Sequence, residues 1–98
     1  MKNIVIVASI KIKSEFRDEV YAQLVKLHKN THTYDDGVVQ YELHKEIGCE
    51  NSFTFIEIWE NEELLGVHEK KDYFLDFIAK LENKLENMSV QKLEKIDL

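Results

Sequence analysis

The sequence predicts an α+β fold in which helices lie on one face of a four-stranded antiparallel sheet, the ferredoxin-like β-α-β-β-α-β arrangement. Two observations support this prediction. The spacing of apolar residues along the 98-residue chain alternates between the strand period of two and the helix period of 3.6, in that order. The chain also contains no proline, and Gly, Asn, Asp or Ser stands where one period gives way to the next. The length fits a single domain over residues 1–98.

The first strand is predicted over residues 2–13, where β-branched residues dominate and successive side chains fall on opposite faces. Residues 14–32 then adopt helical spacing, with Ser14 as a candidate N-cap. One face of this helix is formed by Phe16, Val20, Leu24, Leu27 and Thr31. The Asp-Asp-Gly run at 35–37 ends the helix.

Two further strands are predicted over residues 38–47 and 53–60, and the glycine-containing turn 48–52 joins them into an antiparallel hairpin. In the first of these strands one face carries Val39, Tyr41 and Leu43, and the other carries Gln40, Glu42 and His44. The alternation therefore predicts which side chains of the hairpin point toward the helices.

Residues 61–87 return to helical spacing, with Asn61 as a good N-cap. A break near residues 70–72 is expected to divide them into a short helix and a longer one. Residues 89–97 contain only three apolar positions among charges, which predicts a weaker last strand at the edge of the sheet.

Both faces of the predicted sheet are apolar. The first half of the first strand is apolar on both sides, and Ile56 and Ile58 lie opposite the aromatic face of the third strand. Helices cover only one face in this arrangement, so a solvated second face would be polar. We therefore expect a homodimer in which the uncovered face packs against a second subunit, with Lys11 and Lys13 at its rim.

The charge balance argues against nucleic acid and membrane partners. The chain has 13 basic and 19 acidic residues, a net charge of −6, and the basic residues are scattered. Ile4 to Ile10 loosely resembles a signal sequence, but its alternation continues through Lys11 as in a strand. Cys49 is the only cysteine, which fits a reducing cytoplasm, and no neighbouring His or Lys activates it.

Two residues are candidates for acid–base chemistry. His68 follows Leu64 by four positions on the apolar side of a helix, where it could move protons near neutral pH or serve as a hydrogen-bonded core residue. Glu57 shares a strand face with aromatic residues, so burial should raise its pKa and let it act as acid or base. The alternative for Glu57 is a strand-edge position or a pairing with lysine.

Aromatic residues could form the wall of a substrate cavity. Trp59 and Tyr41 lie on neighbouring predicted strands, and Phe55 and Phe74 could extend the same wall. Aromatic side chains at these spacings are equally typical of an ordinary core.

No cofactor is expected from the sequence. His28 and His32 have the i, i+4 spacing of metal ligands, but the sequence shows no third ligand and places the pair at a solvated helix end. The three glycines are too far apart for a phosphate-binding loop, and the length and element order exclude a flavin or nicotinamide fold.

The whole pattern resembles the antibiotic biosynthesis monooxygenase (ABM) domain, in its quinol-monooxygenase-like branch. The resemblance is carried by five segments: residues 11–19, 36–44 (DGVVQYELH), 53–60 (FTFIEIWE), 64–68 and the Tyr73-Phe74 pair. It implies a dimeric ferredoxin-like α+β barrel with a small cavity between sheet and helices. Many members oxidise phenolic or quinol-type substrates with dioxygen and use neither metal nor flavin, whereas others degrade haem or isomerise a phosphorylated quorum-signal sugar.

The chain departs from the family pattern in two places. Family members often have Ser/Thr-Pro-His-Phe where this chain has residues 71–74 (KDYF), so a second helical histidine is missing. The strand Asn, helical Trp and His of the haem-degrading branch correspond to Val7, His68 and Ile78, which disfavours haem degradation.

The resemblance implies a cofactor-independent monooxygenase in which His68 or Glu57 removes a phenolic proton. The alternatives are an acid–base isomerase and a non-catalytic ligand-binding dimer.

Overall fold

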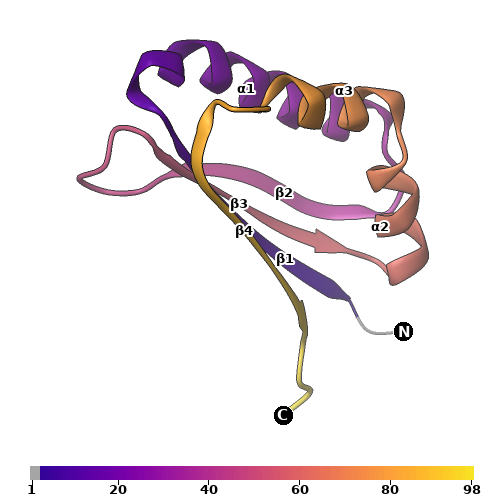
Figure 1. The fold of residues 1–98 in the computed structure, drawn as a ribbon. Coiled ribbons are helices and arrows are strands. Elements are labelled where there is room, and N and C mark those ends of the chain that lie inside the picture. The colour runs from indigo at the N-terminus through magenta and orange to yellow at the C-terminus, as the bar shows by residue number, and fades with distance from the viewer. Residues whose placement is uncertain (1–2) are drawn as a thin grey trace.

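The computed structural model describes residues 3–98 and has the element order β-α-β-β-α-α-β (Figure 1). The elements are β1 (Ile4–Ile12), a 3₁₀ turn η1 (Ser14–Phe16), α1 (Arg17–Tyr34), β2 (Val38–Lys45), β3 (Ser52–Trp59), α2 (Glu62–Glu69), α3 (Asp72–Lys80) and β4 (Leu85–Glu94). The predicted ferredoxin-like fold class is confirmed, including the division of the second helical segment into two helices.

The four strands form one antiparallel sheet in the order β2-β3-β1-β4. Helices α1 and α3 run across one face of the sheet, and α2 lies at the end where β3 finishes (Figure 1). β4 occupies an edge, as predicted. The sheet therefore has one helix-covered face and one face that no other element of residues 3–98 covers.

The core lies between the helices and the covered face of the sheet. Alternate residues of β1 and β3 point into it, so that Ile6 lies opposite Glu57 and Ala8 opposite Phe55. Its fully buried large side chains include Trp59, Tyr41, Phe55 and Leu24. Because strand alternation sends Glu57 to the same face, a carboxyl group enters an otherwise apolar layer.

The predicted end of the last helix and both predicted ends of the first helix are wrong. The last helix ends at Lys80 instead of residue 87, because Asn83 has the positive φ of 63° that turns the chain, and Leu85 then pairs with Ile12 of β1. β4 consequently spans Leu85–Glu94 instead of 89–97. Ser14 begins the 3₁₀ turn and caps no helix, so α1 starts later and ends later than predicted.

Other boundaries agree more closely. Asn61 caps α2 as predicted, because its Oδ1 accepts a hydrogen bond of 2.9 Å from the backbone nitrogen of Leu64. β1 begins at Ile4, and position 2 of the predicted strand lies outside the described residues. None of the helices within residues 3–98 is long and apolar enough to cross a membrane.

The predicted facing of Val39 is also wrong. The register of β2 against β3 shifts between Val38 and Gln40, which is a β-bulge. Val38 therefore lies opposite Trp59 and packs against the core, whereas the side chain of Val39 points outward with 56% of its surface exposed. After the bulge the expected alternation resumes, and Tyr41 is buried.

A candidate active site between the sheet and α2

A cavity of about 70 Å³ lies between the covered face of the sheet and helices α2 and α3. Its walls are almost entirely apolar, and the exceptions are His68, Glu57 and Glu69. Met88 and Val90 of the edge strand β4 line it as well, with exposures of 40% and 57%. The cavity therefore opens to solvent beside β4, whereas His68 in its wall is buried.

His68, in this wall, forms a buried pair with Asp35 behind it. Nδ1 of His68 donates a short hydrogen bond to Oδ2 of Asp35, and both side chains are only 2% exposed. Since Nδ1 carries the shared proton, the other ring nitrogen, Nε2, is the one that can accept a proton from a bound molecule. An orienting carboxylate behind a histidine is the arrangement that activates histidine bases in hydrolases.

The turn between α1 and β2 brings Asp35 to this position. Gly37 follows it with a φ of +79°, and the backbone oxygen of Gly37 accepts a hydrogen bond of 2.8 Å from the nitrogen of Glu60. A β-carbon at residue 37 would lie 2.9 Å from Cβ of Leu64, in the first turn of α2. Only glycine therefore allows the turn to lie this close to the helix that carries His68.

Aromatic rings enclose the imidazole. Its centroid lies 4.6 Å from that of Trp59 and 4.8 Å from that of Phe74. Burial lowers the pKa of His68, because it disfavours the charged ring, and Asp35 offsets part of that effect. The histidine is consequently neutral at pH 7, which is the form that acts as a base.

Other polar groups surround the carboxylate of Asp35. Its Oδ1 lies 3.2 Å from Nζ of Lys71, which also donates to the backbone oxygen of Tyr34 at 3.0 Å. Burial raises the pKa of the Tyr73 phenol, and the neighbouring Asp35 raises it further. Burial also raises the pKa of the Tyr41 phenol. Both tyrosines therefore remain protonated and can donate hydrogen bonds.

Glu57 forms a second polar feature of the same cavity. It is 6% exposed, and its Oε1 accepts a hydrogen bond of 2.9 Å from Nε1 of Trp59. Burial raises its pKa to about 7, against a smaller opposing effect of the Trp59 hydrogen bond. Near neutral pH the group therefore exists in both protonation states.

The structure brings most of the predicted site residues together. His68, Glu57, Tyr41, Phe55 and Phe74 all line the cavity. Trp59 does not line it, but lies behind the wall, where it contacts the His68 ring and hydrogen-bonds Glu57.

His68 and Glu57 line the same cavity but hydrogen-bond to separate partners. His68 pairs with Asp35, and Glu57 pairs with Trp59. Asp35 was not predicted as a site residue, because an aspartate in an Asp-Asp-Gly run is typical of a turn. The signal that could have found it is the need of a buried histidine for a hydrogen-bond partner.

The remaining candidates lie outside the cavity. Cys49 is exposed in the β2–β3 turn. The sequence shows no third ligand beside His28 and His32, but the structure places the Glu42 carboxylate of β2 3.4 Å and 3.7 Å from their Nε2 atoms.

Comparisons with known proteins agree with this architecture. A sequence model of the family described as antibiotic biosynthesis monooxygenase matches residues 3–80. The Bacillus subtilis protein named "Putative monooxygenase YcnE" is 34% identical over 77 residues, which are 79% of this chain and 80% of that protein.

Solved structures show the same fold at lower identity. A protein from Pseudomonas aeruginosa superposes with a TM-score of 0.91 at 23% identity, covering 99% of this chain and 97% of its own. A crystal structure described as an antibiotic biosynthesis monooxygenase has a TM-score of 0.88 at 20% identity, with 96% and 99% covered. From the match over residues 3–80 and the Bacillus relative, we conclude that this chain belongs to the antibiotic biosynthesis monooxygenase family.

Proposed function

We propose that this protein is a cofactor-independent monooxygenase that oxidises a small phenolic or quinol-type substrate with dioxygen. Membership of the family supports a monooxygenase-like function in general. The observation that carries the finer proposal is the Asp35–His68 pair in the wall of an apolar, aromatic cavity. Removal of a phenolic proton is the step that makes such a substrate electron-rich enough to react with dioxygen.

His68 is the proposed base. Its neutral ring carries a proton on Nδ1, which donates a hydrogen bond to Asp35, and offers Nε2 to the substrate hydroxyl. As His68 becomes charged, the buried carboxylate of Asp35 stabilises the imidazolium. The protonated ring can then return the proton to a peroxide oxygen later in the reaction.

The reaction balances without an added reductant for a substrate with a methylene group activated by the phenol. Deprotonation gives a carbanion, which transfers electrons to dioxygen and forms a carbon–peroxide bond. The peroxide is then protonated. The second hydrogen of the methylene carbon leaves as a proton while the O–O bond breaks and water departs, and a carbonyl remains. One oxygen atom ends in the product and the other in water.

The size of the cavity limits the substrate. An apolar cavity of about 150 Å³ holds one benzene molecule. The cavity of this protein, at about 70 Å³, is smaller, so a ring bound at His68 must extend through the opening beside Met88 and Val90. We therefore expect flat substrates whose reactive hydroxyl enters first.

We also propose that the active form is a homodimer joined through the uncovered sheet face. Val5 lies opposite Ile58 and Val7 opposite Ile56 on that face, which makes a continuous apolar strip. Leu93 of β4 extends it on the other side of Val5 and is 45% exposed. Strips of this kind on a sheet are typical of subunit interfaces.

An acid–base isomerase is the second candidate. It is favoured by Glu57, which lines the same cavity as His68 and has a pKa near neutrality. The shifted pKa values of His68 and Glu57 also argue against the alternative of a non-catalytic ligand-binding dimer. Activity that persists without oxygen would identify the isomerase.

Oxygen uptake tests the proposal directly. The protein is incubated with a panel of quinols and anthrones while dissolved oxygen is recorded. We expect uptake with at least one substrate and its loss in His68→Ala. No uptake above that of the variant across the panel would refute the monooxygenase assignment.

A further inference from the structure

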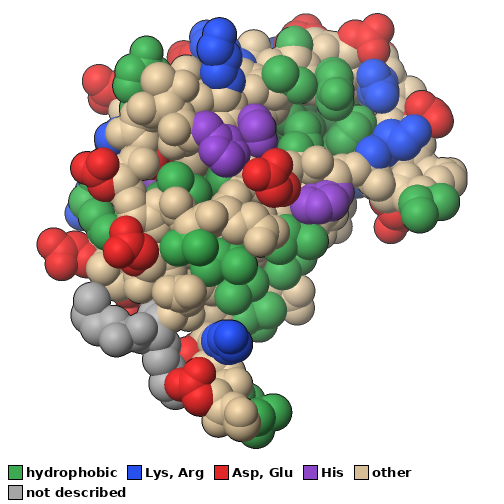
Figure 2. Space-filling model, turned by 180° about the vertical axis from the view of Figure 1, so that it is seen from behind, with side chains coloured by type: hydrophobic (Ala, Val, Ile, Leu, Met, Phe, Trp, Pro, Cys, Tyr) green, Lys and Arg blue, Asp and Glu red, His purple; other side chains and the backbone are tan. Residues whose placement is uncertain are grey.

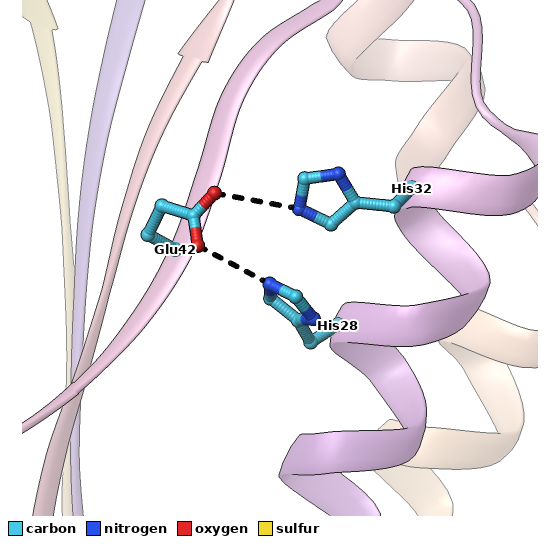
Figure 3. A group of neighbouring side chains, drawn as sticks. All are labelled: His28, His32 and Glu42. Carbon is cyan, nitrogen blue, oxygen red and sulfur yellow. Dashed lines mark hydrogen bonds and ion pairs between the residues drawn. The ribbon is translucent and has the colours of Figure 1, made fainter.

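We propose that His28, His32 and Glu42 form a binding site for a divalent transition metal, with Zn²⁺ as the expected ion (Figure 3). The three side chains come from two elements, α1 and β2, on the outside of the molecule. Their ligand atoms all lie within 4.8 Å of one another. The site is separate from the cavity that holds His68.

The two histidines are placed by the helix. Positions i and i+4 lie one turn apart on the same side of α1, and the ring centroids of His28 and His32 are 4.3 Å apart. Both rings point toward the carboxylate of Glu42 on β2 (Figure 3). The helix thus supplies two nitrogen ligands and the strand one oxygen ligand.

The distances suit a tetrahedral ion. Zn–N and Zn–O bonds of about 2.1 Å imply ligand atoms about 3.4 Å apart at the corners of a tetrahedron. Nε2 of His28 lies 3.4 Å from Oε2 of Glu42, and Nε2 of His32 lies 3.7 Å from Oε1. The two nitrogens face different oxygens of the carboxylate, and the three ligand atoms lie within 4.8 Å of one another, so side-chain rotation must draw them together around the ion. Water would complete the fourth position.

The ligand types favour zinc over magnesium or calcium. Imidazole nitrogens suit Zn²⁺, Cu²⁺ and Ni²⁺, whereas Mg²⁺ and Ca²⁺ need a shell of oxygen atoms. The side chains of His28, His32 and Glu42 are 35%, 41% and 52% exposed, so an ion can enter from solvent. Figure 2 shows histidine and acidic side chains gathered together on this face.

Metal binding would cost two existing hydrogen bonds, and one of them is the 3.4 Å bond from Nε2 of His28 to Oε2 of Glu42. In the other, Nε2 of His32 donates to the backbone oxygen of Tyr41 at 2.7 Å, and it must release that oxygen to bind an ion. Because His32 is partly exposed, water can replace it as the donor. We therefore expect a weaker site than the closed four-ligand sites of zinc fingers.

The location gives the site a structural consequence. Tyr41, next to Glu42 on β2, points the other way and lines the cavity. Thr31, next to His32 on α1, is fully buried and lies near the Tyr41 hydroxyl. An ion would thus tie α1 to β2 directly outside the wall of the candidate active site.

Calorimetric titration of untagged protein with Zn²⁺ tests the proposal. We expect one saturable site per chain and a rise in melting temperature that follows occupancy. His28→Ala and Glu42→Gln should each weaken binding at least about tenfold, because each removes one of three ligands. Both residues are on the surface, so circular dichroism should show unchanged folding.

Two control variants make the test specific. His44→Ala removes another exposed histidine of β2, whose Nδ1 contacts the Thr54 backbone oxygen, and Cys49→Ser removes the exposed thiol. Both should bind Zn²⁺ like the wild type. Absence of a saturable site would overturn the proposal, as would weaker binding in either control or unchanged binding in Glu42→Gln.

Discussion

Asp35 and His68 stand 33 positions apart in the sequence, yet their side chains form a buried hydrogen bond behind the cavity wall that His68 lines. The bond joins the turn before β2 to helix α2. It fixes which ring nitrogen of His68 carries a proton and leaves Nε2 for substrate. The proposed chemistry depends on this pair more than on any single residue.

Replacement of His68 by asparagine tests the role of the base. We expect a loss of turnover on the order of 10²–10⁴-fold, because a general base is removed. The fold should persist, since the amide can still donate to Asp35. The same substitution at the exposed His44 should leave activity unchanged. If His68→Asn unfolds the protein while the folded fraction keeps full activity, His68 is only a core residue.

Replacement of Asp35 by asparagine tests the orienting role. The carboxylate raises the pKa of His68 against the larger effect of burial, so its removal should lower that pKa further. NMR titration of the His68 ring measures this shift. We also expect kcat to fall on the order of 10²-fold or more, as when the carboxylate behind a catalytic histidine is neutralised.

Asp36→Asn is the matched control for Asp35→Asn. Asp36 is the neighbouring aspartate of the same turn, and it is exposed to solvent. Its replacement should change neither the titration of His68 nor kcat. Equal effects of the two substitutions would show that turn stability, and not the Asp35 carboxylate, supports activity.

Much of the fold could be predicted from the sequence because periodicity is a local property. Each strand was recognisable from alternating apolar residues and each helix from apolar residues at helical spacing, and Asn61 was recognisable as a cap. The end of α3 was not, because Leu85 continues the helical spacing and only its pairing with Ile12 places it in a strand. The bulge at Val39 likewise depends on the neighbouring strand.

The site was predictable only in part for the same reason. His68 and Glu57 were recognisable as polar residues on apolar faces. Asp35 and Glu42 were not, because a turn aspartate and an outward-facing strand glutamate look solvated until a distant helix packs beside them. Both acquire their histidine partners through tertiary structure alone.

Glu57 should make stability depend on pH. Its folded pKa of about 7 lies above its ordinary value of 4.5, so the folded state binds more protons between these values. By linkage, this contribution is fully present below about pH 4.5 and is lost as the pH rises through 7. A shift of this size corresponds to about 3 kcal/mol in the free energy of unfolding.

Glu57→Gln measures this contribution. The amide stays neutral and keeps an oxygen that can accept from Nε1 of Trp59. Denaturant titrations of both proteins from pH 4.5 to 8 should show the variant gaining stability relative to the wild type as the pH rises. His68, whose pKa is lowered, titrates in the opposite sense in both proteins and cancels in the difference. A difference that does not change with pH would contradict the raised pKa.

The proposed dimer predicts a specific effect of charge on the uncovered face. Val7→Lys places an ammonium group beside Ile56, in the apolar strip, and should convert the dimer to a monomer. Val25→Lys, at a 44% exposed position of α1, should leave the dimer intact. Light scattering at micromolar concentration distinguishes these outcomes. A monomeric wild type would refute the interface.

A comparison of Gly37→Ala with Gly48→Ala separates the effect of backbone strain from the effect of close contact in the turn that positions Asp35. Both have positive φ, +79° and +85°, so alanine should cost about 1–2 kcal/mol at either position. A β-carbon at 48 meets nothing within 4 Å, whereas one at 37 lies 2.9 Å from Cβ of Leu64. Gly37→Ala should therefore be clearly more destabilising in thermal unfolding than Gly48→Ala. It should also reduce kcat, because moving the turn away from α2 separates Asp35 from His68, while Gly48→Ala keeps full activity. Equal stability and activity of the two variants would mean that the turn tolerates displacement and does not set the geometry of the pair.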